Sequence, residues 1–267
     1  MSDSSASSCR VIGAGLLLLS LLLSLALGAC ATPPRDAAER ASFEETNDPL
    51  EPLNRQIFEL NQFLDGILLK PAAQVYVAAV PGDARDALRR VIDNMKEPTI
   101  VINNALQGEF TRAKISFGRL ALNTTIGVLG IIDVGKRFGL DKQTGDFGQT
   151  LFVWGLPEGP YLVLPVLGPS NPRDAIGVIV DSYGDPLDYL ANAKDLDELE
   201  IGRFAADGID QRARVLDVLE DLQKNALDFY AQLRSLSRQR RAVELRHGEL
   251  PPAKGFYEDP GAGSARP

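Results

Sequence analysis

The side chains that most often carry out covalent chemistry are scarce in this chain. Its 267 residues include one histidine, His247, and two cysteines, Cys9 and Cys30. A hydrolase needs a nucleophile with a partner base, and the Gly-x-Ser-x-Gly elbow of serine hydrolases does not occur in the sequence. Asp185 and Asp188 form a carboxylate pair, but acidic pairs near turns are commonplace. The sequence therefore predicts a protein that is not an enzyme, and a hydrolase is the least favoured hypothesis.

The composition also argues against metals, cofactors and nucleic acids as ligands. A structural zinc site takes about four Cys or His ligands, more than the chain's two cysteines and one histidine supply. A net charge of −8 and a pI of about 4.8 repel phosphate backbones. With 45% hydrophobic and 24% charged residues, the chain has the composition of a folded protein. We expect no metal, no cofactor and no nucleic-acid partner.

The one cysteine with a clear chemical context is Cys30. It follows the apolar run Leu16–Leu27 and the small pair Gly28-Ala29, a pattern that resembles a bacterial lipobox. The run is too short for a membrane span, which needs about 20 residues, and suits the core of a secretory signal. We therefore predict a signal peptide over residues 1–29 and lipidation of Cys30; the alternative is an uncleaved membrane anchor. Ala31, where inner-membrane lipoproteins similar to enterobacterial ones have Asp, favours the outer membrane.

The elements that follow the anchor read as helices. Residues 30–46 have no apolar period, which predicts a flexible tether. We predict a helical domain over residues 47–248 and a disordered tail over residues 249–267. Five apolar residues recur at the spacing of one helix face: Leu53, Ile57, Leu60, Leu64 and Ile67. A second helix is expected over Ala84–Lys96, with Pro98 ending it or starting the next one.

Three later segments differ in character. Ile115–Ile132 carries a single charge, Arg119, and predicts a helix in the core or partly in the membrane, with Asn123, Gly127 and Gly130 as a small-residue face. Gly148–Ser170 is apolar but rich in glycine and proline, which excludes a long helix. Asn171 opens a further helix, and Ile209–His247 reads as one long amphipathic helix with a basic end.

Several of these segments together resemble one family. Asn47-Asp48-Pro49-Leu50-Glu51-Pro52-Leu53-Asn54-Arg55 is similar to the opening motif of the MlaA (VacJ) lipoprotein family. The segment 119–134 resembles a second motif. Asp146–Thr150, together with Trp154-Gly155, 158–165 and 167–170, resembles a third. Residues 230–248 resemble the Arg-rich C-terminal helix of the family. The likeness covers about residues 47–248, in the order and spacing of the family.

The resemblance implies a fold and a role. It implies a mainly α protein: a ring of amphipathic helices embedded in or lying on the outer membrane of a Gram-negative bacterium, anchored from the periplasmic side, with a Gly/Pro-rich apolar hairpin loop. An amphipathic channel through such a ring removes mislocalised phospholipids from the outer leaflet and passes them to the periplasmic carrier MlaC, which maintains lipid asymmetry. Trimeric porins are the implied membrane partners.

Channel or gating candidates follow from the same motifs. They are Asn54, Arg55, Asn123, Gly155, Gly159, Pro160 and Tyr161. Polar residues of this kind also serve as helix caps or interhelix hydrogen bonds, and this alternative stays open for each of them. Pro157 stands where the family commonly has glycine, and its fixed φ stiffens the loop. The alternative function is a structural envelope lipoprotein that scaffolds porins.

Overall fold

The computed structural model describes residues 46–188 and 197–249. The predicted signal peptide, Cys30, the tether up to residue 45 and the tail from residue 250 lie outside the described residues, so these expectations stay predictions. Within the described part the chain is mainly helical, as expected, with a two-stranded antiparallel hairpin. The elements in chain order are α3 (Glu51–Leu64), the π-helix η1 (Asp65–Leu69), α4 (Lys70–Ala79), α5 (Gly82–Leu106), α6 (Phe110–Thr125), α7 (Val134–Arg137), α8 (Phe147–Val153), β1 (Leu162–Leu164), β2 (Gly168–Ser170), α9 (Pro172–Gly184), α11 (Asp197–Arg214), α12 (Leu216–Asn225) and α13 (Phe229–Glu244).

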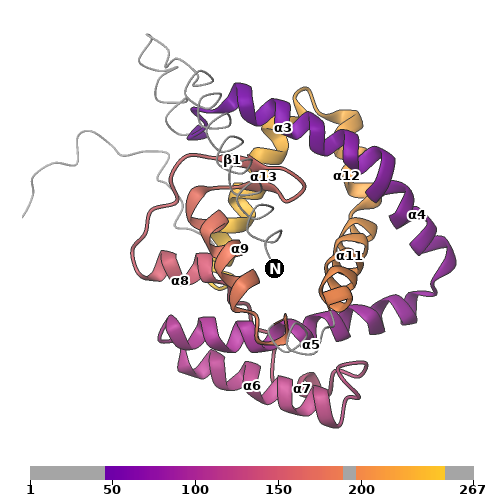
Figure 1. Cartoon of the computed structure of the whole chain (residues 1–267), viewed down its shortest axis with the longest axis vertical. Coiled ribbons are helices and arrows are strands. Elements are labelled where there is room, and N and C mark those ends of the chain that lie inside the picture. Colours follow the sequence, from indigo (N-terminus) through magenta and orange to yellow (C-terminus); the bar gives the residue numbers. More distant parts are fainter. Residues whose placement is uncertain (1–45, 189–196, 250–267) are drawn as a thin grey trace, which may run out of the picture.

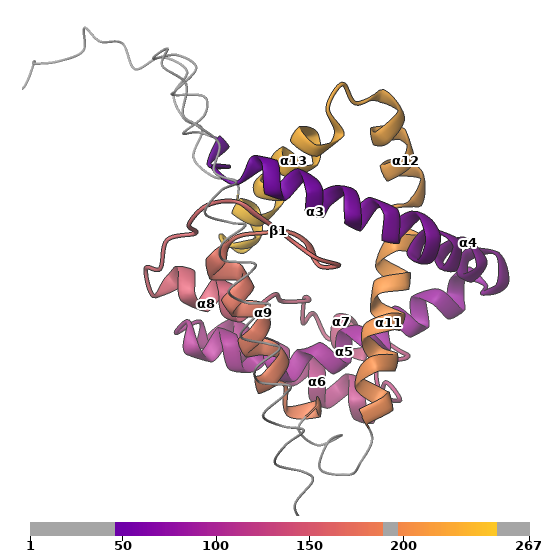
Figure 2. The ribbon, with the colours of Figure 1, turned by 45° about the horizontal axis from the view of Figure 1, so that its top comes forward.

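The helices are arranged as a ring (Figure 1). α3, α4 and α5 follow one another around it, α8 and α9 continue it, and α11, α12 and α13 return the chain to α3. α6 packs along the outer side of α5 and carries α7 with it. The β1–β2 hairpin reaches into the ring beside α3, as the turned view in Figure 2 shows. The chain thus brings its first and last described helices together.

Local sequence signals explain where the helices begin. Asp146 caps α8 in a capping box with Gln149, in which each side chain bonds the other residue's backbone N–H. Asn171 caps α9 by accepting a hydrogen bond from the backbone N–H of Asp174, and Pro172 occupies the first helical position. Asp228 caps α13 in the same way. The prediction that Asn171 opens a helix is confirmed.

The helix predicted over residues 53–67 is present and continues beyond them. It runs through α3 and η1 into α4 without leaving helical geometry. Pro71 has no N–H to give to the carbonyl of Ile67, four residues earlier. The single π turn of η1 lies directly before this proline, where the regular hydrogen-bond ladder is interrupted.

Pro98 does not divide the next helix, contrary to expectation. α5 runs unbroken over Gly82–Leu106 with the proline inside it. An interior proline costs about 3 kcal/mol, but α5 buries a long face against α6 that includes Ile92, Glu97 and Ile100. Tertiary packing therefore outweighs the local preference for a break.

The helix predicted over residues 115–132 ends early, at Thr125. The chain then turns back, with Val128, Leu129 and Gly130 at positive φ. Gly127 and Gly130 thus form a tight turn after α6 rather than a small-residue helix face with Asn123, which corrects that expectation. A Cβ on Gly127 would lie 2.3 Å from the carbonyl oxygen of Ile132, so the turn requires glycine there.

The long helix predicted over residues 209–247 is instead three helices. α11 ends at Arg214, α12 spans Leu216–Asn225, and α13 starts at Phe229. The apolar period continues across both breaks, so periodicity alone does not detect them. By contrast, Gly148–Ser170 contains no long helix, as predicted; it forms α8, a loop and the hairpin.

The described residues bury polar groups and expose apolar ones to an unusual degree. Eighteen polar or charged residues are buried in this part of the chain, against nine apolar ones. Thirty-two large apolar residues are exposed there, spread over most helices. Soluble monomers show the opposite arrangement. No helix in the described ranges has the length and apolar character needed to cross a membrane.

Candidate functional site

A cavity of about 1180 Å³ lies between the hairpin loop, α9, α12 and α13. Its lining has two chemically different parts. The apolar part includes Leu167, Val178, Val215, Val218, Leu219, Leu233 and Leu236. The polar part includes Asp146, Glu158, Arg173, Asp174, Asp181, Arg238, Arg240, Arg241 and Arg246. The cavity exceeds the roughly 300–1,000 Å³ of typical small-molecule pockets.

α12, together with Val215 directly before it, supplies much of the apolar part, and α12 has no buried residue of its own. Val218 is 59% exposed and Val215 is 38% exposed. Leu236 of α13 and Val178 of α9, both exposed, add to the same lining. Exposed apolar side chains that converge on one cavity mark a binding surface for an apolar ligand.

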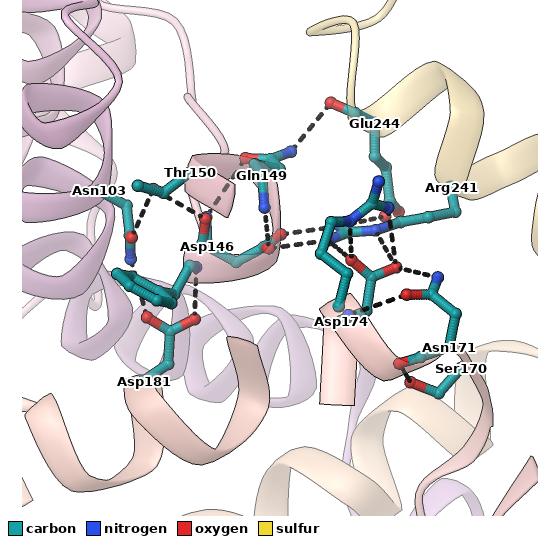
Figure 3. A network of polar contacts seen from close by, with 12 residues as sticks. Asn103, Asp146, Gln149, Thr150, Ser170, Asn171, Asp174, Asp181, Arg241 and Glu244 are labelled. Atoms are coloured by element: carbon teal, nitrogen blue, oxygen red, sulfur yellow. Dashed lines mark hydrogen bonds and ion pairs between the residues drawn. The ribbon is translucent and has the colours of Figure 1, made fainter. Parts of the chain in front are cut away.

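The polar part of the lining is organised by Arg241 of α13 (Figure 3). Its guanidinium forms two bonds of 2.8 Å to the carboxylate of Asp146, which caps α8, and two of 2.9 Å to the carboxylate of Asp174, in the first turn of α9. Burial opposes the charge on Asp174, but hydrogen bonds from Arg241 and Arg173 outweigh it and hold the pKa of that carboxyl below its usual range. One arginine therefore fixes the starts of two helices at the cavity wall.

A second cluster of polar side chains joins α5 to this wall. The Asp181 carboxylate accepts bonds of 2.8 Å from the backbone N–H of Phe147 and from the side chain of Asn103 (Figure 3). Thr150 donates to Asn103 over 2.9 Å and accepts from Gln107 over 3.0 Å. Burial raises the pKa of Asp181. These contacts tie α8 and α9 to the end of α5.

Two glycines allow α8 and α9 to approach closely. A Cβ on Gly177 of α9 would lie 2.4 Å from the backbone nitrogen of Gly148 of α8. A Cβ on Gly148 would lie 2.6 Å from the carboxylate of Asp174 and 2.7 Å from the guanidinium of Arg241. Any side chain at these positions would displace the polar wall.

Asn54, a predicted channel residue, is buried and binds the hairpin. Its side chain donates to the carbonyl of Tyr161 over 3.0 Å and to Asp48 over 2.8 Å, and accepts from the N–H of Val163 over 2.9 Å. It does not line the cavity. Asn61 repeats the pattern: it donates to the carbonyl of Leu164 over 2.9 Å and accepts from the N–H of Val166 over 2.8 Å. Both asparagines thus hold the hairpin to α3.

Arg55, a second candidate, helps to close the ring. It binds Asp228, the cap of α13, over 2.6 Å and lies 4.4 Å from the centre of the Tyr230 ring. The hydrogen bond from Arg55 lowers the pKa of Asp228 to about 2. The buried Asp48 accepts from Tyr230 over 2.5 Å and from Arg234 over 2.6 Å. The opening motif therefore fastens the first helix to the last.

Asn123, a third candidate, lies apart from the cavity, in the α6–α7 unit. It accepts from the N–H of Gly135 over 2.8 Å and donates to Asp133 over 3.3 Å. Arg119 on the same helix binds Glu97 over 2.9 Å and Asp133 over 3.2 Å. These residues join α5, α6 and α7 and do not line the cavity.

The four loop candidates lie at the cavity or next to it. Gly155, Gly159 and Tyr161 line it, whereas Pro160 between them does not. Gly155 and Gly159 adopt φ of 91° and 73°, which favour glycine. Burial raises the pKa of Tyr161 to about 12. Pro157 lines the cavity between the two glycines.

Other polar residues have structural partners. Asp185 and Asp188, the carboxylate pair, bind Arg203 of α11 over 2.8 and 2.6 Å. In the described ranges no three His, Cys, Asp or Glu side chains gather closely enough to hold a metal ion. Sequence reasoning missed the pairing of Arg241 with Asp174. The sequence does show an acidic helix start at Asn171–Asp174 and a basic end to α13, but neither pattern indicates which residue the other will contact.

Comparisons with known proteins agree with this arrangement. The family model described as MlaA lipoprotein matches residues 46–244. The intermembrane phospholipid transport system lipoprotein MlaA of Escherichia coli K12 is 32% identical over 240 residues, covering 86% of this chain and 91% of that protein. Its namesake in Haemophilus influenzae is 30% identical over 248 residues, covering 91% and 95%.

Further likenesses point the same way. An uncharacterised protein of Rickettsia bellii is 34% identical over 204 residues, covering 76% of this chain and 78% of that protein. A solved structure concerned with the structural basis for maintenance of bacterial outer membrane lipid asymmetry matches with a TM-score of 0.65 at 33% identity. It covers 74% of this chain and 98% of its own. This chain belongs to the MlaA lipoprotein family.

Proposed function

We propose that this protein is an outer-membrane lipoprotein that removes mislocalised phospholipids from the outer leaflet through the cavity described above. It passes them to a periplasmic carrier and so maintains the lipid asymmetry of the outer membrane. The family and the names of its relatives support a part in intermembrane phospholipid transport. The transport breaks no covalent bond, so the protein needs no catalytic residue.

The observation that carries the proposal is the two-sided lining of the cavity. A phospholipid has apolar acyl chains and a headgroup with a phosphate. The apolar lining from α12, α13 and Leu167 suits the chains, and the arginines of α9 and α13 suit the phosphate. Since the lining arginines come with carboxylates such as Asp146 and Asp174, the polar part also accommodates a zwitterionic headgroup.

The distribution of apolar side chains supports a position within the membrane. Exposed apolar residues occur on η1, α6 and the turn after α6, among them Leu68, Phe117 and Leu129, each more than 60% exposed. Many of the buried polar residues bind one another, as Arg119 binds Glu97 and Thr150 binds Asn103. This arrangement is stable where hydrocarbon surrounds the helices. Acyl chains on Cys30 complete the anchor, because two or three chains hold a protein stably on a membrane.

Two protein partners belong to the proposal. A soluble carrier of the MlaC type receives the lipid on the periplasmic side, and trimeric porins hold the ring in the membrane. A structural envelope lipoprotein that only scaffolds porins is the competing function. It uses the exposed apolar faces but has no need for the cavity.

A complementation experiment separates these functions. Cells lacking the protein receive the wild type, Val218→Glu or Gln223→Glu. Val218 lines the cavity, whereas Gln223 is an exposed residue of the same helix outside the lining, so both variants add one negative charge to α12. We expect outer-leaflet phospholipid, measured with added phospholipase, to accumulate with Val218→Glu only. Equal rescue by both variants, with porin levels disturbed in the deletion strain, would favour the scaffold.

A further inference from the structure

A second, smaller cavity of about 360 Å³ lies at the far end of α13. It is formed by Arg112 of α6, the segment 142–144, and Val243, Glu244, His247 and Gly248. Its lining shares Glu244 with the larger cavity and no other residue. The two cavities therefore have largely different linings that meet at Glu244.

Arg112 brings a positive charge to this cavity without a carboxylate partner. Its Nε donates to the Asn104 side chain over a long 3.4 Å, and no Asp or Glu of the described residues forms an ion pair with it. Burial lowers the pKa of Arg112, while Glu109 acts in the opposite sense. A partly buried guanidinium keeps its charge, and Arg112 lines the cavity without a carboxylate partner from the described ranges to neutralise it.

His247 brings a second group in need of a partner. Its Nδ1 is buried and has no hydrogen-bond partner among the described residues. The backbone of His247, at a φ of 55°, is held by a bond from its N–H to the carbonyl of Glu244. Burial lowers the pKa of His247, and the nearby Arg112 lowers it further. Because Nδ1 has no exposed surface, the imidazole meets the cavity through its other ring atoms.

The acidic groups around the cavity are either paired or exposed. Glu244 accepts from Arg240 over 2.7 Å and from Arg241 over 3.5 Å. Asp93 pairs with Lys142, which also lines the cavity, over 2.7 Å. Glu109 and Glu249 are exposed to solvent. Arg112 is therefore the charged residue of the lining that has no ion-pair partner among the described residues.

We propose that this cavity binds an oxyanion of the phosphate class, with the guanidinium of Arg112 and the imidazole of His247 as its principal donors and Lys142 at its edge. Arginine matches tetrahedral oxyanions with two parallel hydrogen bonds. Two sources carry this chemistry: a free phosphate compound and the headgroup of a phospholipid. The proposal holds whether or not the larger cavity transports lipid.

The single histidine makes the test specific. The full lipoprotein, purified without a histidine tag in a non-ionic detergent and labelled with ¹⁵N-histidine, gives imidazole signals from His247 alone. These signals are followed by NMR during titration with inorganic phosphate, glycerol phosphate and dihexanoylphosphatidylglycerol. We expect a saturable shift and a higher His247 pKa in the bound form, because a bound anion favours the charged imidazole. The nearby Arg112 and Lys142 disfavour that charge, whereas Glu109, Glu244 and Glu249 favour it as the anion does.

The matched variants are Arg112→Gln and Lys114→Gln. Both remove one positive charge from α6, but Lys114 is exposed and lies outside both cavities. We expect Arg112→Gln to weaken binding tenfold or more and Lys114→Gln to change it less than twofold. If Arg112→Gln does not fold, Arg112→Lys keeps the charge and loses the paired donors, and weaker binding is again expected.

The three ligands separate the two sources. A response to inorganic phosphate as strong as that to the lipid assigns the site to free phosphate compounds, and a response to the lipid alone assigns it to a headgroup. Titrations without saturation for all three ligands, or equal binding by Arg112→Gln and Lys114→Gln, would overturn the proposal.

Discussion

Asn54 and Asn61 lie two helical turns apart on α3 and bind the backbone of the same hairpin. Seven helical residues rise about 10.5 Å, and three extended residues span about 10 Å. The groups bound by Asn61, on Leu164 and Val166, lie three residues beyond those bound by Asn54, on Tyr161 and Val163. The helix thus binds the hairpin backbone at two places whose separation along the helix nearly equals their separation along the hairpin.

The two asparagines should contribute unequally to stability, because they differ in burial. Asn54→Ala leaves buried groups of Tyr161, Val163 and Asp48 unpaired, and we expect the free energy of unfolding to fall by about 2–4 kcal/mol. Asn61 is partly exposed, so Asn61→Ala should cost about 1 kcal/mol. Urea denaturation in detergent measures both. Gln56→Ala, at an exposed position of α3, serves as the control and should change stability by less than about 0.5 kcal/mol.

The arginine at the polar wall should be far more sensitive than its neighbour. Arg241→Gln leaves Asp146 and Asp174 without their shared partner, and we expect a loss of about 2–4 kcal/mol in the free energy of unfolding. Arg240 is 80% exposed and pairs with Glu244 one turn away, so Arg240→Gln should cost less than about 0.5 kcal/mol. Similar losses from the two substitutions would contradict the anchoring role of Arg241.

The close contact of α8 and α9 gives a prediction with an internal control. Gly177→Ala places a methyl group against the backbone of Gly148, and we expect a lower thermal midpoint, equivalent to at least about 1–3 kcal/mol. Gly184 lies at the end of the same helix with no atom near its absent Cβ. Gly184→Ala should therefore leave the midpoint unchanged or raise it. A tolerated Gly177→Ala would show that the two helices can separate.

The contact between Arg55 and Asp228 predicts a pH dependence. The folded pKa of Asp228, about 2, lies below its unfolded value near 3.8. The stabilisation is therefore complete above about pH 4 and is lost as the pH falls toward 2. Asp228→Asn keeps a cap on α13, because asparagine caps helices as well as aspartate, but removes the charge. The stability difference between the two proteins should shrink over this range; a constant difference would contradict the ion pair.

The anchor gives a prediction that rests on sequence alone. Cys30→Ser removes the thiol that carries the acyl chains, and we expect less protein in the outer-membrane fraction and impaired function. Cys9 lies within the predicted signal peptide, so Cys9→Ser should change neither. If Cys30→Ser fractionates with the outer membrane and functions normally, the helices suffice as the anchor.

How much the sequence could predict depended on the range of the interactions involved. Helix starts at Asn171 and the absence of a long helix in Gly148–Ser170 follow from local signals, and both predictions are confirmed. Pro98 was misjudged because packing of α5 against α6 outweighs a local preference. The breaks at Val215 and Asp228 were missed because the apolar period runs through them, while the contact of Asp228 with Arg55 joins residues far apart in the chain.

The candidate site residues also divide into those whose role the sequence could predict and those whose role depends on contacts between distant parts of the chain. The sequence singled out Gly155, Gly159 and Tyr161, which line the cavity. It also singled out Asn54, Arg55 and Asn123, whose contacts within the protein hold elements together. A polar residue in a family motif has the same appearance in sequence whether it meets a ligand or a backbone. Only the fold shows which groups each amide reaches.

The central claim is that phospholipid passes through the large cavity. A photo-crosslinking amino acid placed in living cells at Val218, and separately at Gln223, tests it directly, because both lie on α12 and only Val218 lines the cavity. After irradiation, mass spectrometry of the purified protein identifies bound lipid. The account predicts phospholipid adducts at position 218 and few at position 223. Adducts at 223 but not at 218, or none at either position, would contradict it.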